Sequence, residues 1–210
     1  MLRRDIWRLG LVHAPIQAVA AAGALDAFRI DWLAPGPALT FHADPFGLWR
    51  DGRLHLFAEA YDYRTRRGVI AVQIYDVELR LLDQQTVLSE PWHLSYPFVF
   101  ERDGEVWMIP ESCANGTVDL YRATAFPGGW VKESTLLSGV VASDATLVEH
   151  GGRWWMFATI RDGGGTIRDG GGAFSDALHL WSAPDFRGPW TPHANNPVLI
   201  DIASARPAGR

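Results

Sequence analysis

The chain has 210 residues, of which 48% are hydrophobic and 20% are charged, a composition typical of a folded domain rather than a disordered one. Its formal net charge of −5 disfavours nucleic acid as the main partner, and no uncharged apolar run is long enough to predict a membrane-spanning helix. A single cysteine, Cys113, excludes an internal disulfide and a cysteine-based zinc site. The 10 tryptophans, 21 glycines and 13 prolines favour short strands joined by turns over long helices.

The first segment, 1–41, is expected to hold a closing strand and a short helix. A strand is predicted over 6–12 and a helix over 16–28, where apolar residues follow helical spacing although Gly23 lies on the same face. Two arginines before an alanine-rich stretch faintly resemble a signal peptide, but an acidic residue and Pro15 interrupt that pattern. We therefore expect a cytoplasmic protein.

A repeat dominates the rest of the chain. Three segments align without gaps, at 42–60, 94–112 and 142–160. One column of this alignment holds Asp44, Tyr96 and Asp144, and a glycine stands eight residues after each of them. Each unit is predicted to be a hairpin, two strands joined by a tight turn in which glycine supplies the positive φ.

A second half-repeat extends each unit, because residues 120–130 match residues 180–190. Each unit then holds about four strands, which is the content of a propeller blade. We predict an all-β fold with one domain over 1–210 and these divisions: blades at 42–94, 95–142 and 143–204, and the start of a further blade at 205–210.

Two features concern the later part of the chain. The heptapeptide TIRDGGG at 159–165 recurs at 166–172, and we expect a loop insertion rather than a phosphate cradle because no lysine follows. Residues 204–210 resemble a blade opening that lacks its hairpin. Because an open propeller exposes sheet edges, we expect a fragment or a truncated reading frame, the alternatives being closure by a second chain or an open arc.

The stretches HADPF, EPWHLSYPFVFE, MIPESCANGTVDLYRAT, LVEHGGRWWMFAT and GPWTPHANNPV together resemble a known family. They are similar to the N-terminal domain of plant glucosamine inositolphosphorylceramide transferases, whose bacterial relatives occur alone or beside formyltransferase-like domains. The resemblance covers about 7–210 and is most specific over 90–124. It implies an incomplete five-bladed propeller related to arabinanase- and fructosidase-type glycosidases, with the transferase chemistry in a separate C-terminal domain.

Candidate catalytic residues follow from the blade openings, which meet near the central channel of a propeller. The resemblance to propeller glycosidases implies that Asp44 is a base or nucleophile and that Asp144 tunes charge and holds the sugar. It also implies an acid in the next blade openings, where this chain has Tyr96 and Arg206. Glu111 is the best substitute acid because its apolar neighbours would raise its pKa. The alternative is that these carboxylates only bind backbone N–H groups.

Residues that contact the ligand are predicted around these carboxylates; they are His42, Trp92, His93, Tyr96, Ser112 and Arg206. The two histidines flank the blade openings and suit a sugar hydroxyl or a phosphate, or they only satisfy backbone groups. Trp92 lies in a loop where an aromatic ring can stack on a sugar. Glu59, in the column of Glu111, is expected to be structural, as is an inert Cys113. We expect no metal, because no HExxH motif accompanies the histidines.

Three functions remain open from the sequence. The first is a carbohydrate-recognising propeller that binds an acidic or phosphorylated glycan beside Arg206 and acts in glycan or glycolipid assembly with a partner transferase. The second is a glycosidase-type hydrolase that uses Asp44 and Glu111, with Asp144 as modulator. The third is a non-catalytic protein-interaction propeller. The expected ligand is a glycan or sugar phosphate; no cofactor, nucleic acid or membrane span is expected.

Overall fold

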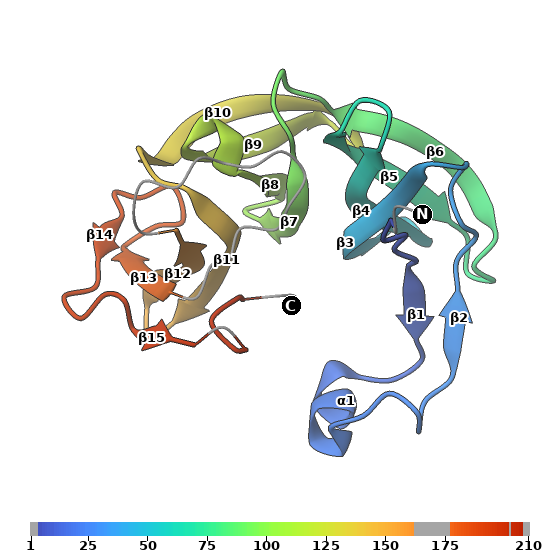
Figure 1. The fold of residues 1–210 in the computed structure, drawn as a ribbon, viewed down its shortest axis with the longest axis horizontal. Coiled ribbons are helices and arrows are strands. Elements are labelled where there is room, and N and C mark those ends of the chain that lie inside the picture. Colours follow the sequence, from blue (N-terminus) through green and yellow to red (C-terminus); the bar gives the residue numbers. More distant parts are fainter. Residues whose placement is uncertain (1–3, 162–176, 202, 208–210) are drawn as a thin grey trace.

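The computed structural model describes residues 4–161, 177–201 and 203–207, and shows three antiparallel sheets arranged in an open arc (Figure 1). The first sheet contains β3 (Thr40–Arg50), β4 (Arg53–Asp62), β5 (Arg67–Tyr75) and β6 (Leu81–Leu88). The second contains β7 (Ser95–Arg102), β8 (Glu105–Ser112), β9 (Thr117–Ala125) and β10 (Gly128–Ser138), with a 3-10 turn, η1 (Cys113–Asn115). The third contains β11 (Ala142–His150), β12 (Arg153–Ile160), β13 (Ala177–Ala183), β14 (Thr191–Pro192) and β15 (Leu199–Ile200).

Each sheet is a meander in which strands pair in chain order, the arrangement of a propeller blade. The first strand of each blade (β3, β7 or β11) lies on the inside of the arc, and the last lies on the outside (Figure 1). β15 stands apart from this order because it pairs with β13. Most of the duplicated TIRDGGG sequence lies at 162–172, outside the described residues.

The hairpin that opens each blade ends in a two-residue turn. Both residues of each turn have positive φ: 52° and 69° at Asp51 and Gly52, and 55° and 78° at Asp103 and Gly104. The third hairpin has a pair of glycines at the same place, with φ of 60° and 72°. Positive φ at both positions defines the type I′ turn, whose twist matches that of paired strands. The repeated glycine column therefore marks the tips of three equivalent hairpins.

The other end of each hairpin has a second feature in common, a β-bulge. Asp44, Tyr96 and Asp144 have φ of 51°, 41° and 57°, and the strand register shifts at each of these positions. Positive φ is uncommon for a residue other than glycine, and a bulge re-aims the side chains around it. The aligned column is thus a set of three bulges on the inner strands.

The half-repeat is explained by a phenylalanine that packs one blade against the preceding one. Phe186 is fully buried, and its ring centroid lies 5.0 Å from that of Trp107 in the second blade. Phe126, its counterpart in the half-repeat, packs in the same way on His55 of the first blade, at 4.7 Å. Large aromatic side chains bury much apolar surface, so these two residues hold adjacent blades together.

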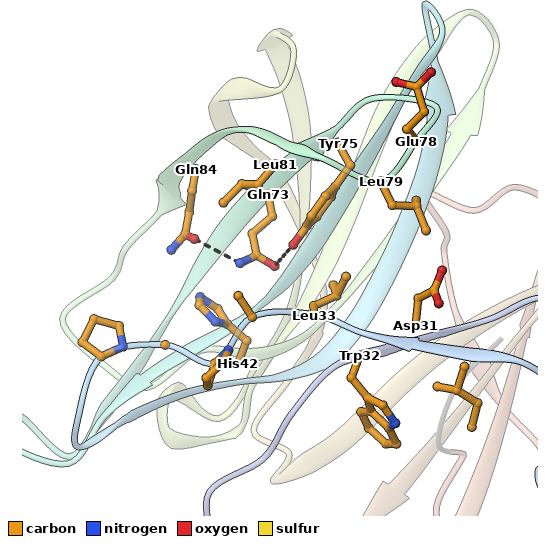
Figure 2. A pocket seen from close by; sticks show the side chains of 15 residues that line it. Asp31, Trp32, Leu33, His42, Gln73, Tyr75, Glu78, Leu79, Leu81 and Gln84 are labelled. Atoms are coloured by element: carbon orange, nitrogen blue, oxygen red, sulfur yellow. Dashed lines mark hydrogen bonds between the residues drawn. The ribbon is translucent and has the colours of Figure 1, made fainter.

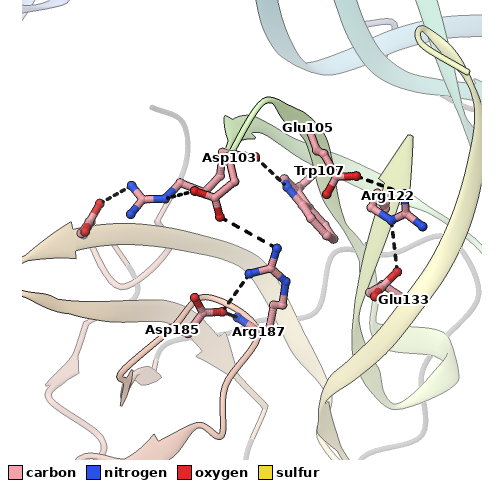
Figure 3. Close-up of polar contacts among 9 residues, drawn as sticks. Asp103, Glu105, Trp107, Arg122, Glu133, Asp185 and Arg187 are labelled. Carbon is pink, nitrogen blue, oxygen red and sulfur yellow. Dashed lines mark hydrogen bonds and ion pairs between the residues drawn. The ribbon is translucent and has the colours of Figure 1, made fainter. Parts of the chain in front are cut away.

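Charged side chains surround Trp107, the partner of Phe186 (Figure 3). The Arg187 guanidinium lies 4.7 Å from the centre of the Trp107 ring and forms ion pairs with Asp103 and Asp185. Beyond Trp107, a second group joins three side chains; they are Glu105, Arg122 and Glu133. Exposed ion pairs contribute at most about 1 kcal/mol each, so the buried rings supply most of the stabilisation here.

The N-terminal segment forms a two-stranded ribbon, β1 (Gly10–Val12) paired with β2 (Ile30–Trp32), with α1 (Ile16–Ala22) at its far end (Figure 1). The strand predicted over 6–12 is therefore shorter, and in the described part of the chain it pairs only with β2. The helix predicted to run to residue 28 ends at Ala22, because Gly23 adopts a φ of 64° and its N–H donates to the Val19 carbonyl.

The ribbon packs against the first blade through a small apolar cluster of its own. Leu9 and Leu33 contact Leu56, Ala58 and Tyr75 of the first blade. This cluster is separate from the main core, which runs through all three blades. No helix in the described ranges is both long enough and apolar enough to cross a membrane.

Candidate functional site

The candidate site lies on the inside of the arc, where the bulged ends of the three blades come together. Four carboxylates and one guanidinium influence each other electrostatically here; we call them the inner cluster, and they are Asp44, Glu59, Glu111, Asp144 and Arg206. Three blades contribute to it, because Asp44 and Glu59 come from β3 and β4, Glu111 from β8 and Asp144 from β11. The repeat therefore places together residues that are far apart in the sequence.

Asp144 and Arg206 form the best-defined contact in the inner cluster. Arg206 Nε and Nη2 donate to the two Asp144 carboxylate oxygens, at 2.8 and 2.9 Å. The Asp144 side chain is buried, whereas the Arg206 side chain is 48% exposed. Such two-point pairs are geometrically specific. One edge of the guanidinium therefore binds Asp144 and is not available to a ligand.

Glu111 lies directly against this pair. Its Oε2 accepts a hydrogen bond from the backbone N–H of Asp144, at 3.1 Å. Burial and, to a smaller extent, the Asp144 carboxylate raise the pKa of Glu111 to about 7, although Arg206 opposes the shift. The Cys113 thiol also donates toward Glu111, and burial raises the pKa of that thiol to about 12. Glu111 can therefore exchange a proton near neutral pH, whereas Cys113 stays a neutral thiol.

Glu59 also belongs to the inner cluster, although from the sequence it was expected to have only a structural role. It is buried, with 6% of its surface exposed. Burial, together with repulsion from Asp44 and Glu111, raises its pKa to about 8. A carboxyl group that keeps its proton at neutral pH can donate a hydrogen bond. In the sequence, Glu59 occupies the same position of the repeat as Glu111. That alignment points to the site but does not show that the side chain is buried.

His93 orients toward Glu59. Its Nδ1 accepts the backbone N–H of Gly68 at 2.9 Å, so the proton of the neutral ring lies on Nε2, which is 3.5 Å from Glu59 Oε1. A Cβ on Gly68 would lie 2.5 Å from the Leu94 carbonyl oxygen and 2.7 Å from Glu59 Oε1. Glycine is therefore required at position 68 for this close approach. Burial also lowers the pKa of His93.

Asp44 is the most open carboxylate of the inner cluster, being exposed to solvent. The surrounding protein raises its pKa, and the Asp144 carboxylate contributes in the same direction. A hydrogen bond from the backbone N–H of Tyr96 opposes this shift. Asp44 combines access to solvent with a fixed orientation, which is what a ligand-binding carboxylate needs.

The remaining predicted contact residues lie in different surroundings. Tyr96 is buried, and its hydroxyl lies 2.8 Å from Thr146 Oγ1 and donates to the Pro207 carbonyl oxygen at 2.9 Å. Ser112 is also buried and donates to the Thr117 carbonyl at 2.8 Å. These two hydroxyls brace the backbone around the inner cluster.

Trp92 and His42 are the last two of the predicted ligand-contact residues. Trp92 is half-buried against the core, and its Nε1 finds no hydrogen-bond partner in the described ranges. His42 does not join the inner cluster, because it lines a cavity on the other side of the first blade with Gln73 and Tyr75. Across the described residues, no three acidic, histidine or cysteine side chains are arranged to hold a metal ion.

Comparisons with known proteins show the family of this chain. The family model described as glucosamine inositolphosphorylceramide transferase 1, N-terminal, matches residues 32–210. The glucosamine inositolphosphorylceramide transferase 1 of Arabidopsis thaliana is 36% identical over 81% of this chain and 22% of its own length. The protein of the same name from Oryza sativa subsp. japonica is 31% identical over 97% of this chain and 29% of its own length. The chain thus spans less than a third of either relative.

Among solved structures, a levansucrase from Bacillus subtilis is similar with a TM-score of 0.66 at 9% identity, covering 85% of this chain and 62% of that chain. Identity this low shows the fold alone. The fold is the predicted all-β, incomplete five-bladed propeller of the glycosidase-like type. From the family match and the relatives, this chain belongs to the family of N-terminal domains of glucosamine inositolphosphorylceramide transferase 1.

Proposed function

We propose that the inner cluster binds a sugar and that this chain acts in glycan or glycolipid assembly beside a transferase. The observation that carries the proposal is the gathering of four carboxylates from three blades around one arginine. Carboxylates accept hydrogen bonds from sugar hydroxyl groups in fixed directions. The bulges and the pair between Asp144 and Arg206 hold these acceptors in place before a ligand arrives.

The charge of the inner cluster narrows the class of sugar. Even with Glu59 protonated, the other carboxylates outnumber the guanidinium, and one edge of that guanidinium already binds Asp144. An anionic group would be repelled by this arrangement, so a neutral or amino sugar is favoured over the phosphorylated glycan expected from Arg206 alone. The name of the relatives includes glucosamine, whose protonated amine suits a site rich in carboxylates.

Calorimetric titration of the chain with glucosamine, glucose and glucose phosphate tests this proposal. We expect affinity to fall in that order, and the preference for glucosamine over glucose to weaken with added salt. The Glu111→Gln variant removes a carboxylate next to Asp144 and should reduce the preference for the amine. A preference for glucose phosphate, or no binding of any of the three, would overturn the proposal.

A second candidate, a glycosidase-type hydrolase, is favoured by one observation. Glu111 has a pKa of about 7, which suits a proton donor near neutral pH, and Asp44 supplies a second carboxyl group. Turnover of aryl glycosides by the chain should then drop about 10²–10⁴-fold in Glu111→Gln, with sugar affinity nearly unchanged. Measurable sugar affinity without turnover would remove the hydrolase and leave the binding function.

A further inference from the structure

A second cavity lies away from the inner cluster, between the ribbon and the first blade; we call it the outer cavity (Figure 2). Residues 30–37 form one wall, and side chains of β3, β5 and β6 form the other. Its volume is about 580 Å³. Pockets for small ligands typically measure about 300–1,000 Å³. The outer cavity is therefore large enough for a small molecule.

A chain of neutral hydrogen bonds lines the outer cavity. The Tyr75 hydroxyl donates to Gln73 Oε1 at 3.1 Å, and Gln73 Nε2 donates to Gln84 Oε1 at 3.0 Å (Figure 2). Gln73 and Tyr75 are buried, with 5% and 4% of their surfaces exposed. The chain fixes the orientation of both amides, and it leaves the Gln84 NH₂ group as a donor at its exposed end.

His42 supplies the second polar element of the outer cavity. It is buried, with 9% of its surface exposed, and its imidazole points toward Gln73 (Figure 2). Burial lowers its pKa, so the ring is neutral at neutral pH and offers one donor and one acceptor. Its ring has no hydrogen-bond partner in the described part of the chain. Because the ring lines the outer cavity, a ligand there can pair with both the donor and the acceptor of His42.

The charges around the outer cavity exclude some ligands. Its lining contains two acidic residues, Asp31 and Glu78, and no arginine or lysine. Asp31 is already bound by Arg29 and His13. A phosphate or carboxylate ligand would therefore meet no cation among the lining residues.

The placement of the aromatic rings around the outer cavity disfavours a further class of ligand, the flat nucleobases. Trp32 points away from Gln73 and Tyr75 in Figure 2, so it does not face the Tyr75 ring to sandwich a flat base. Besides Trp32 and the Tyr75 ring, the apolar lining is aliphatic and includes Leu33, Leu79 and Leu81. Such a wall fits the C–H face of a saturated ring rather than the plane of a nucleobase.

We propose that the outer cavity is a second ligand site, separate from the inner cluster, that binds a neutral sugar or polyol. Neighbouring hydroxyl groups both donate and accept, which matches the donor and acceptor of His42 and the donors of Gln84. The aliphatic wall covers the C–H groups of the same molecule. This site is independent of the function proposed for the inner cluster.

Nuclear magnetic resonance of the full chain labelled with ¹⁵N at histidine tests the proposal, with glucose, inorganic phosphate and adenosine as probes. We expect glucose to shift the His42 resonances and the other two to leave them in place. The variants His42→Phe, which keeps a ring, and Gln84→Ala, which changes an exposed side chain, should each weaken glucose binding about three- to tenfold. Urea unfolding of Gln84→Ala separates lost binding from lost stability, because this exposed side chain also accepts a hydrogen bond from Gln73. Gln85→Ala, on the next exposed residue of β6, is the matched control and should leave the affinity unchanged.

Three results would overturn this second site. One is the absence of any His42 shift with glucose in the folded chain. Another is a larger shift with phosphate or adenosine than with glucose. The third is loss of the glucose-dependent His42 shift in Glu111→Gln, because that variant changes only the inner cluster and would show that a single site accounts for all binding.

Discussion

The two ends of the blade hairpins differ in how their side chains are held. At the tips, type I′ turns lead into aromatic contacts such as that of the fully buried Phe186 with Trp107. At the opposite ends, bulges with positive φ carry the carboxylates Asp44 and Asp144. One end buries apolar surface at no electrostatic cost, whereas the other gathers like charges. The tips therefore stabilise the arc, and this stability supports a strained, charged site at the other end.

The largest loss of stability is expected from Phe186→Ala, which removes an aromatic contact at the hairpin tips. The ring touches Phe100, Trp107 and Trp154, so its removal leaves a cavity between two blades. We expect the free energy of unfolding, measured with urea, to fall by about 3–5 kcal/mol. Phe126→Ala, at the equivalent and less buried position, should cost less. A loss below about 1 kcal/mol for Phe186→Ala would show that the tips do not hold the blades together.

A smaller loss is expected for Gly68→Ala, which acts on the charged end. The new Cβ would meet the Leu94 carbonyl oxygen at 2.5 Å, and backbone there cannot yield easily. We expect about 1–3 kcal/mol of destabilisation in urea, together with a changed His93 resonance as its contact with Glu59 shifts. Gly47→Ala is the control, because the nearest atom there is the end of the flexible Leu54 side chain, at 3.1 Å. Equal effects of the two variants would contradict the close packing inferred at position 68.

The charged end should also make stability depend on pH. The folded chain keeps the Glu59 proton up to about pH 8, whereas the unfolded chain releases it near 4.5. The folded state thus binds more protons between these values, so the free energy of unfolding falls as pH rises through this window. Glu59→Gln should remove a drop of a few kcal/mol between pH 5 and pH 8, and Glu111→Gln a smaller one. A pH profile that is the same in Glu59→Gln and the native chain would refute the burial of an ionisable group at this position.

Much of the fold could be predicted from the sequence because its signals are local. The glycine column reports turns that need positive φ, and the half-repeat reports the Phe126 and Phe186 contacts. The clustering of Asp44, Glu111 and Asp144 also followed from the columns, because equivalent positions in successive blades face the same channel. Each of these inferences needs only the period of the repeat.

Other features of the site depend on non-local detail that the sequence does not show. His42 and Asp44 are two residues apart and would share one face of a regular strand, but the bulge after Ala43 separates them, so His42 lines the outer cavity. Glu59 was taken as structural, because its burial is set by strands distant in sequence. Arg206 was expected to lie beside a ligand, and its pairing with Asp144 becomes visible only in three dimensions.

The smallest effect on stability is expected for Asp44→Asn. This variant distinguishes most directly between a binding role and a structural role for the charged end of the hairpins. Asp44 is exposed, and asparagine tolerates its φ of 51°, so the backbone strain stays the same. We expect the free energy of unfolding to change by less than about 0.5 kcal/mol. Glucosamine affinity should nevertheless fall roughly tenfold or more, because a charge-assisted hydrogen bond is lost. Titration calorimetry and urea unfolding on the same sample check both halves. A large loss of stability with unchanged affinity would assign Asp44 to the scaffold instead, and the two ends of the hairpins would then share one structural role.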